Sequence, residues 1–404
     1  MKTGAIQAEE PRPTSHATAW LILAVLLLFS LAAPLNQFKV PPIIPILMDA
    51  LGLSVSGAGL LMSVYAVTGL ILALPSGLIY QKAGYRVTGL LAGGSMVVGA
   101  TLGALSWGMG SLLTSRVIEG IGISFMAVLA PAIIAQWFAA RQRGTAMGIW
   151  ATWVPIGTAA MLILAPAIAE SFGWRAVWWF GAAYALAVTV LYLAVVRPAP
   201  TGRLIESGAA PSSPTVTSGQ VMRDRNLWLL SAALGAFIAA AIGLGTYMPT
   251  FLTTQHGLTL AQAALVSSIP TLIAIFSAPA GGLLSDRLGS RKKPILAGLA
   301  LAVILLPVVG AVSLAGLIVV LILQGLVFGV IPTNIMAAAV EAAGDERQGG
   351  AAMAVIMVGQ NAGMLLGPIV FGALAEGAGW PAAFASLAAM SALGLLAGWL
   401  VRVR

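Results

Sequence analysis

The sequence predicts an all-α membrane protein with twelve transmembrane helices, and three observations support this fold class. Of the 404 residues, 59% are hydrophobic and only 8% are charged, and the mean hydropathy is +0.99. A soluble domain of this length could not present such a composition to water. Apolar segments long enough to cross a ~30 Å hydrocarbon core recur along the chain. The second half also repeats the pattern of the first, which predicts two six-helix bundles related by a pseudo-twofold parallel repeat.

Each predicted helix is an apolar segment of a length that suits a membrane span. The expected spans are 17–48, 56–80, 88–108, 111–139, 144–169, 176–196, 226–252, 260–284, 294–313, 315–340, 349–375 and 381–401.

The basic residues indicate how these spans are oriented. If the N-terminus is cytoplasmic, 17 of the 20 Lys and Arg residues fall in cytoplasmic segments. The three others are Arg175, in an outer loop, and Lys39 and Arg116, within helices. The positive-inside rule therefore places both termini in the cytoplasm. The net charge of +8 is explained by topology, so no nucleic-acid partner is expected.

Soluble-enzyme chemistry has no sequence signature here. There is no cysteine, no phosphate-binding P-loop, no H-E-x-x-H and no G-x-S-x-G. His16 and His256 lie in the polar N-terminal segment and an outer loop, where neither can relay protons across the bilayer. We expect no enzyme activity, no cofactor and no metal site.

The chain divides at a polar segment rich in Pro, Ser, Thr and Gly, residues 197–225, which predicts a flexible cytoplasmic linker. It separates a six-helix bundle at 17–196, preceded by a cytoplasmic tail at 1–16, from a second bundle at 226–404. Residues 52–84 align without a gap on residues 257–289, an offset of 205. Duplicated halves of this kind typically hold a transported substrate near the midplane, between the halves.

Two loops carry a motif that resembles one in a known family. "GGLLSDRLGSRKK", at 281–293, matches the loop motif G-x-x-x-D-R-x-G-R-K/R of the major facilitator superfamily. The first half carries "GLIYQKAGYR", with Gln81 where the family usually has Asp. The resemblance implies a gating motif, not substrate ligands, at Gly77, Gly84, Arg86, Gly282, Asp286, Arg287, Gly289 and Arg291. We expect its acid and base to pair across the cytoplasmic gate.

A second motif, "RVIEGIG" at 116–122, resembles the R-x-x-x-G-x-G of the same family. Together with the twelve spans and the repeat, the resemblance covers the chain from residue 17 onward. It implies a secondary transporter in which the first, fourth, seventh and tenth helices line a central cavity. It also implies that the two halves rock around a central site.

Charged side chains inside predicted spans are costly in lipid and are usually functional. Lys39 lies about ten residues, roughly 15 Å, from the outer end of the first span, and Asn36 shares its face. Snorkelling of Lys39 to the surface is the alternative. Arg116 and Glu119 lie one turn apart and either bind ligands or form a simple salt bridge. Two cations and one carboxylate leave one surplus positive charge, which favours an anionic ligand.

Prolines predict the local backbone beside Lys39. Pro41, Pro42 and Pro45 remove backbone donors, so the outer third of the first span should be bent or unwound. Irregular backbone at membrane depth is tolerated against protein or a water-filled cavity. We therefore expect Lys39 to face a cavity.

The second half contributes only neutral polar side chains to its predicted interior. Tyr247 and Asn334 are candidate ligands, with packing as an equal alternative. The tryptophans, Trp178 among them, are expected mostly at the membrane interfaces.

These observations predict a secondary transporter for a small anion, an organic carboxylate being favoured. The substrate-binding candidates are Lys39, Asn36, Arg116, Tyr247 and Asn334. Glu119, the one carboxylate in a predicted interior, is the candidate for proton coupling. The alternatives are proton-driven efflux of drugs or metabolites and a membrane sensor that transports nothing. We expect a monomer in a lipid bilayer, the bacterial inner membrane, with H+ as the coupling ion.

Overall fold

The computed structural model describes residues 16–72, 75–138, 140–197, 223–343 and 349–402, and these residues form helices and no strand. The first half contains α1 (His16–Gln37), η1 (Pro41–Ile43), α2 (Ile44–Leu51), α3 (Val55–Leu72), α4 (Pro75–Ala104), α5 (Met109–Trp137), α6 (Ala140–Ala151), α7 (Trp153–Phe172) and α8 (Trp174–Val195). The second half contains α11 (Arg225–His256), α12 (Leu260–Leu288), α13 (Lys292–Val308), α14 (Leu314–Ala343), α15 (Gly349–Gly377) and α16 (Trp380–Leu400).

The predicted all-α membrane architecture is confirmed. Eleven candidate spans are long and apolar enough to cross a membrane in the described part of the chain. The predicted span that these eleven leave out, 294–313, corresponds to α13, which has only 17 helical residues. The predicted tail at 1–16 and linker at 197–225 lie, apart from His16, Arg197 and residues 223–225, outside the described residues.

The first predicted span is interrupted where its prolines require it. Helix α1 ends at Gln37, residues 38–40 form a turn, and a short 3-10 helix begins at Pro41 before α2 resumes. Proline has no N–H and cannot donate to the carbonyl four residues earlier, so the helical ladder stops there. The predicted break in this span is therefore confirmed.

Glycines in a left-handed conformation mark equivalent turns in the two halves. Among the described residues, positive φ angles occur at six glycines: Gly52 (62°), Gly84 (74°), Gly173 (80°), Gly257 (65°), Gly289 (58°) and Gly379 (84°). At the 205-residue offset, Gly52 corresponds to Gly257 and Gly84 to Gly289, while Gly173 and Gly379 differ by one position. The repeated sequence thus folds into repeated backbone turns, where a side chain would cost strain.

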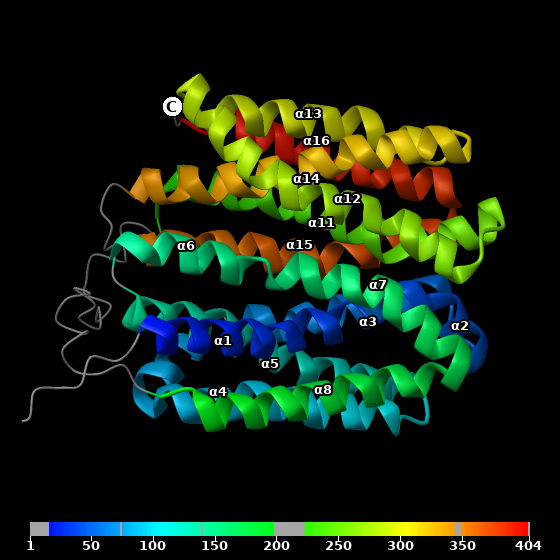
Figure 1. The fold of residues 1–404 in the computed structure, drawn as a ribbon. Helices are drawn as coiled ribbons and strands as arrows, with labels where there is room; N and C mark the ends of the chain where they lie inside the picture. The colour runs from blue at the N-terminus through cyan, green and yellow to red at the C-terminus, as the bar shows by residue number, and fades with distance from the viewer. Residues whose placement is uncertain (1–15, 73–74, 139, 198–222, 344–348, 403–404) are drawn as a thin grey trace, which may run out of the picture.

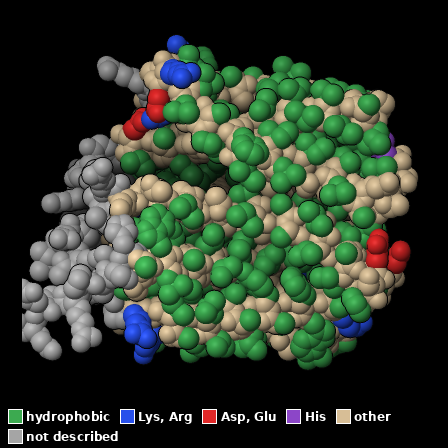
Figure 2. Space-filling model, viewed as in Figure 1, with side chains coloured by type: hydrophobic (Ala, Val, Ile, Leu, Met, Phe, Trp, Pro, Cys, Tyr) green, Lys and Arg blue, Asp and Glu red, His purple; other side chains and the backbone are tan. Residues whose placement is uncertain are grey.

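The helices run roughly parallel, with α1–α8 stacked below α11–α14 and α16 in the view of Figure 1. We call the end where α1 begins and α16 ends the terminal end, and the end where α2 and α11 finish the opposite end. In Figure 2 most charged side chains lie near the two ends, and hydrophobic side chains cover the surface between them, as expected for a face in contact with lipid.

The two halves touch at the opposite end and part at the terminal end. Helix α3 packs against α15, and α7 packs against α12. Hydrogen bonds join Val55 and Ser56 of the first half to Tyr247 and Glu376 of the second. Figure 2 shows the surface hollowed between the halves near the terminal end. The structure is therefore closed at one end and hollowed at the other.

Candidate functional site

Three charged side chains meet inside the first half, where α1 is interrupted. Lys39 Nζ lies 2.6 Å from Glu119 Oε1, and Arg116 Nη1 is ion-paired with Glu119 Oε2. All three side chains have 0% of their surface exposed. Burial of charge is tolerated only when partners replace water. Glu119 supplies one negative charge to two cations, so the cluster keeps the surplus positive charge that the sequence predicts.

Arg116 also caps the interrupted end of α1. Its Nη1 donates to the carbonyl oxygen of Asn36 at 2.6 Å, and its Nη2 donates to that of Gln37 at 2.9 Å. In a continuous helix the carbonyl of Gln37 would accept from residue 41, which is Pro41 and has no N–H. Its Nε donates to the carbonyl of Leu61 on α3 at 2.9 Å. The guanidinium therefore joins the broken helix to α3 and α5.

The glycines of "RVIEGIG" let α5 lie close enough for these contacts. A Cβ at Gly120 would lie 2.0 Å from Thr68 Oγ1 and 2.4 Å from the carbonyl oxygen of Tyr65, both on α3. A Cβ at Gly122 would lie 2.7 Å from the carbonyl oxygen of Ala92 on α4. Only glycine leaves α5 this deep between its neighbours, which brings Arg116, about one turn before Gly120, within reach of α3.

Lys39 and Arg116 each lie over an aromatic ring. Lys39 Nζ is 4.6 Å from the ring centroid of Trp178, is shielded from solvent, and donates to Asn36 Oδ1 at 2.9 Å. The Arg116 guanidinium carbon is 4.5 Å from the ring centroid of Tyr65. Such cation–π contacts stabilise desolvated cations. The expectation that Trp178 belongs to the interface belt is wrong, because this side chain is fully buried beneath Lys39.

The prediction that Lys39 faces a cavity is also wrong for this conformation. The side chain of Lys39 points toward α5 and α8, because its contacts are Glu119 and Trp178, and none of it is exposed. Asn36 follows the same direction and donates to the carbonyl of Gly181 on α8 at 3.5 Å. Nor does Lys39 snorkel to the surface, since none of its side chain is exposed. In this conformation the cluster has no surface that a dissolved anion could reach.

The structure does not bring Tyr247 and Asn334 to the charged cluster. Tyr247 Oη lies 3.0 Å from the carbonyl oxygen of Val55 on α3 and 3.1 Å from that of Pro368 on α15. Asn334 donates to the carbonyls of Gly281 at 3.3 Å and Val330 at 2.8 Å. Both side chains are fully buried. In this conformation they join helices, which is the packing alternative.

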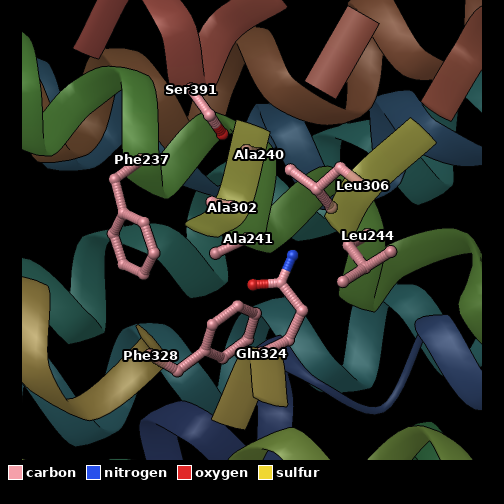
Figure 3. A pocket seen from close by; sticks show the side chains of 9 residues that line it. All are labelled: Phe237, Ala240, Ala241, Leu244, Ala302, Leu306, Gln324, Phe328 and Ser391. Carbon is pink, nitrogen blue, oxygen red and sulfur yellow. The ribbon is translucent and has the colours of Figure 1, made fainter. Parts of the chain in front are cut away.

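The second half has an uncharged counterpart of the cluster. At the 205-residue offset, Leu244 stands for Lys39, Leu321 for Arg116 and Gln324 for Glu119. A narrow pocket surrounds Gln324 (Figure 3), lined by Phe237, Ala240, Ala241, Leu244, Ala302, Leu306, Gln324, Phe328 and Ser391. Its walls are mainly apolar, and Gln324 Oε1 and Ser391 Oγ have no hydrogen-bond partner among the described residues. The concentrated charge therefore belongs to the first half alone.

The loop motif of the second half forms a network within that half. Arg291 Nη1 lies 2.6 Å from Asp286 Oδ1, and Arg291 Nε donates to Glu341 Oε1 on α14 at 2.9 Å. The hydrogen bond to Glu341 raises the pKa of Arg291. Arg287 is exposed. The expected pairing of acid and base across the gate is wrong for this structure, because Asp286 and its partner belong to one half, beside the open hollow.

Glycines of the two loop motifs play different parts. Gly289 caps α12 in a left-handed conformation, and Gly84 interrupts α4 with a φ of 74°. At Gly77 and Gly282, a Cβ would have no neighbouring atom closer than 3.8 Å, so neither glycine permits a close approach here. Arg86 is exposed, and its guanidinium lies 5.9 Å from the ring centroid of Tyr85. Of these four motif glycines, only Gly84 and Gly289 adopt a backbone conformation that requires glycine.

Sequence reasoning missed the aromatic and backbone partners of the cluster. Tyr65, Trp178 and the carbonyl of Leu61 come from α3 and α8, far from Lys39 in the chain. A further backbone partner, the carbonyl of Gln37, does have a sequence signal, because Pro41 lies four residues later and leaves this carbonyl without its helical donor. A buried arginine is well suited to supply that donor.

Comparisons with known proteins agree with this architecture. The family model described as Major Facilitator Superfamily matches residues 26–351 and 252–404. An uncharacterized transporter of this type from Mycobacterium tuberculosis (strain CDC 1551 / Oshkosh) is 28% identical over 378 residues, covering 92% of this chain and 83% of the relative. The D-galactonate transporter of Escherichia coli O6:H1 is 24% identical over 383 residues, covering 87% of each chain.

A solved structure with the same fold is that of a bacterial homologue of the human lysosomal transporter Spinster, in an inward-facing and unoccupied conformation. It superposes with a TM-score of 0.82 at 17% identity, covering 96% of this chain and 98% of the other.

Proposed function

This chain belongs to the major facilitator superfamily, and we propose that it moves a small anion, most suitably an organic carboxylate, across the membrane by alternating access with proton coupling. The observation that carries the proposal is the fully buried cluster of two cations and one carboxylate. A surplus positive charge in a site of low dielectric favours an anion. The name of the relative that transports D-galactonate, a carboxylate, supports the same substrate class.

Lys39 is the better anion ligand of the two cations. The Arg116 guanidinium already donates four hydrogen bonds, three to backbone carbonyls and one to Glu119. Among the described residues, Lys39 donates hydrogen bonds only to Asn36 and Glu119. A substrate carboxylate could replace Glu119 at Lys39 without breaking the cap on α1, and the Asn36 amide would remain beside it. We therefore assign anion binding to Lys39 and Asn36, with Arg116 supplying positive charge.

Glu119 couples the anion to a proton in this proposal. When ionised, it neutralises Lys39 and competes with the substrate. When protonated, it releases Lys39, and an anion and a proton then occupy the cluster together. Because the cluster has no exposed surface here, entry of either requires movement at the turn of residues 38–40. We place both termini in the cytoplasm of a bacterial inner membrane from the distribution of basic residues, so the hollow opens to the cytoplasm.

Uptake by proteoliposomes tests this proposal. We expect radiolabelled D-galactonate or another carboxylate of a small panel to accumulate when the outside is made acidic, and a protonophore to abolish accumulation. Lys39→Ala should abolish uptake, because it removes the ligand charge, whereas Lys39→Arg should retain part of it. Glu119→Gln should remove the dependence on the proton gradient while anion exchange persists.

Three results would count against the proposal. If Lys39→Ala took up substrate as well as the original protein, Lys39 would not be an anion ligand. Accumulation that a protonophore does not change would exclude proton coupling. Export of a lipophilic cation such as tetraphenylphosphonium, with no carboxylate flux, would favour an efflux transporter instead.

A further inference from the structure

The first turn of α3 is held by side chains from the other half of the molecule. The backbone N–H of Ser56 donates to Glu376 Oε2 at 3.1 Å, and Ser56 Oγ donates to the same oxygen at 2.6 Å. Tyr247 Oη, on α11, lies 3.0 Å from the carbonyl oxygen of Val55. These contacts join the first residues of α3 to the end of α15 and to α11.

The contact of Glu376 is a helix cap supplied from a distance. The first N–H groups of a helix have no partner within the helix, and a carboxylate there also meets the positive end of the helix dipole. Caps normally come from residues adjacent in the chain, but Glu376 is 320 positions away from Ser56. Ser54 Oγ binds the N–H of Gly57 at 3.2 Å and lies 3.1 Å from Ser56 Oγ. The carboxylate therefore completes a capping network that α3 does not complete itself.

Two glycines leave room for the tyrosine. A Cβ at Gly59 would lie 1.8 Å from Tyr247 Oη, and a Cβ at Gly372 would lie 2.2 Å from it. The ring of Tyr247 stacks on Phe371 with the centroids 4.9 Å apart. Gly59, Gly372 and Phe371 together hold the Tyr247 side chain in one position beside Val55. The hydroxyl is therefore already placed for the hydrogen bond between the halves.

We infer that Val55, Ser56, Tyr247 and Glu376 form a latch that keeps the opposite end closed, and that protonation of Glu376 opens it. Glu376 is exposed, so protons reach it directly from bulk water, unlike the buried Glu119. A neutral carboxylic acid is a weaker acceptor than a carboxylate and no longer interacts with the helix dipole. Acid therefore weakens the cap, and of the hydrogen bonds described above between this turn and the second half, the one between Tyr247 and Val55 remains.

In the part of the chain that the structure describes, no charged side chain contacts Glu376 and opposes this dependence on pH. The groups that face it are the hydroxyls of Ser54 and Ser56 from the start of α3 and the phenol of Tyr247 from α11. All three are neutral at and below neutral pH. Opening of the latch thus depends on one titrating group. This inference goes beyond the proposed transport, because the opening needs no substrate.

A single cysteine reports the opening. The natural chain contains no cysteine, so Ser63→Cys introduces a unique thiol. Ser63 lies one turn after Gly59 on the same face of α3, which faces the second half. It is fully buried, and its Oγ has no hydrogen-bond partner among the described residues. The nearly isosteric change therefore removes no bond, and a hydrophilic maleimide should modify the thiol only when the halves separate.

We expect slow labelling of the purified Ser63→Cys protein at about pH 7 and faster labelling at about pH 4, where a glutamate begins to be protonated, relative to the same protein denatured at each pH. Adding Glu376→Gln should raise the normalised rate about two- to fivefold at the higher pH and abolish the dependence on pH. Equal normalised rates with and without Glu376→Gln at both pH values would overturn the latch.

Two further variants separate the latch from general effects. Tyr247→Phe keeps the ring and removes the hydroxyl, so labelling should rise about fivefold while the dependence on pH remains. Glu170→Gln removes an exposed charge from the end of α7 and should change nothing. If Glu170→Gln raised the rate as much as Glu376→Gln, net charge at this end would explain the effect, and the specific cap would be excluded.

Discussion

At the scale of single residues, the interior of the first half depends on the charge of Glu119. This carboxylate contacts both buried cations, and the Cγ of Glu119 would lie 2.7 Å from a Cβ at Gly99, so the side chain is enclosed on the α4 side as well. A buried ion pair contributes little net stability compared with a well-packed apolar set. Removing one partner, however, leaves the others without compensation.

Glu119→Gln should therefore destabilise the folded protein by about 3–5 kcal/mol, because Lys39 and Arg116 lose their only buried counter-charge. The measurement is thermal or denaturant unfolding of the purified protein in detergent. The double variant Glu119→Gln with Lys39→Met should recover part of the loss, since one uncompensated cation is removed with it. Unchanged stability in the single variant would contradict the ionised cluster.

At the scale of elements, the position of α5 depends on glycines, and the cluster depends on that position. Gly120→Ala should cost about 1–3 kcal/mol, because the new methyl group would overlap Thr68 Oγ1 and, more rigidly, the backbone carbonyl of Tyr65. Unfolding measurements also test this change. Gly94→Ala is the matched control, because nothing lies within 4 Å of its methyl position on α4. A loss in Gly94→Ala as large as in Gly120→Ala would refute the packing explanation.

The broken first span shows what local sequence can and cannot predict about an element. Pro41 and Pro42 predict the interruption from covalent chemistry, since neither residue has an N–H. They do not predict what satisfies the freed carbonyls. Arg116 does so from a helix about 80 positions away along the chain, at the Asn36 and Gln37 carbonyls. The direction in which Lys39 points follows from that contact and from Trp178.

At the scale of the whole molecule, the alternating access that we propose requires the two halves to separate at the opposite end. A covalent link across the contact between Ser56 and Glu376 should stop D-galactonate uptake if the proposed substrate class is correct. Ser56→Cys combined with Glu376→Cys, treated with a short cleavable thiol cross-linker, should lose more than about nine-tenths of its uptake, and reduction should restore it. Each single-cysteine variant treated in the same way is the control. Full uptake with complete cross-linking would exclude rocking about this contact.

The class of the protein, the repeat and the site of the helix break can all be predicted from the sequence. These follow from hydropathy, residue spacing and proline chemistry, which act along the chain. It also identified Lys39, Arg116 and Glu119 and their surplus charge. The pairing of Glu119 with Lys39, and the burial of the Lys39 side chain against α8, come from the packing of the helices. The helical period places residues on a face, but the neighbour that covers this face is set by packing between distant helices.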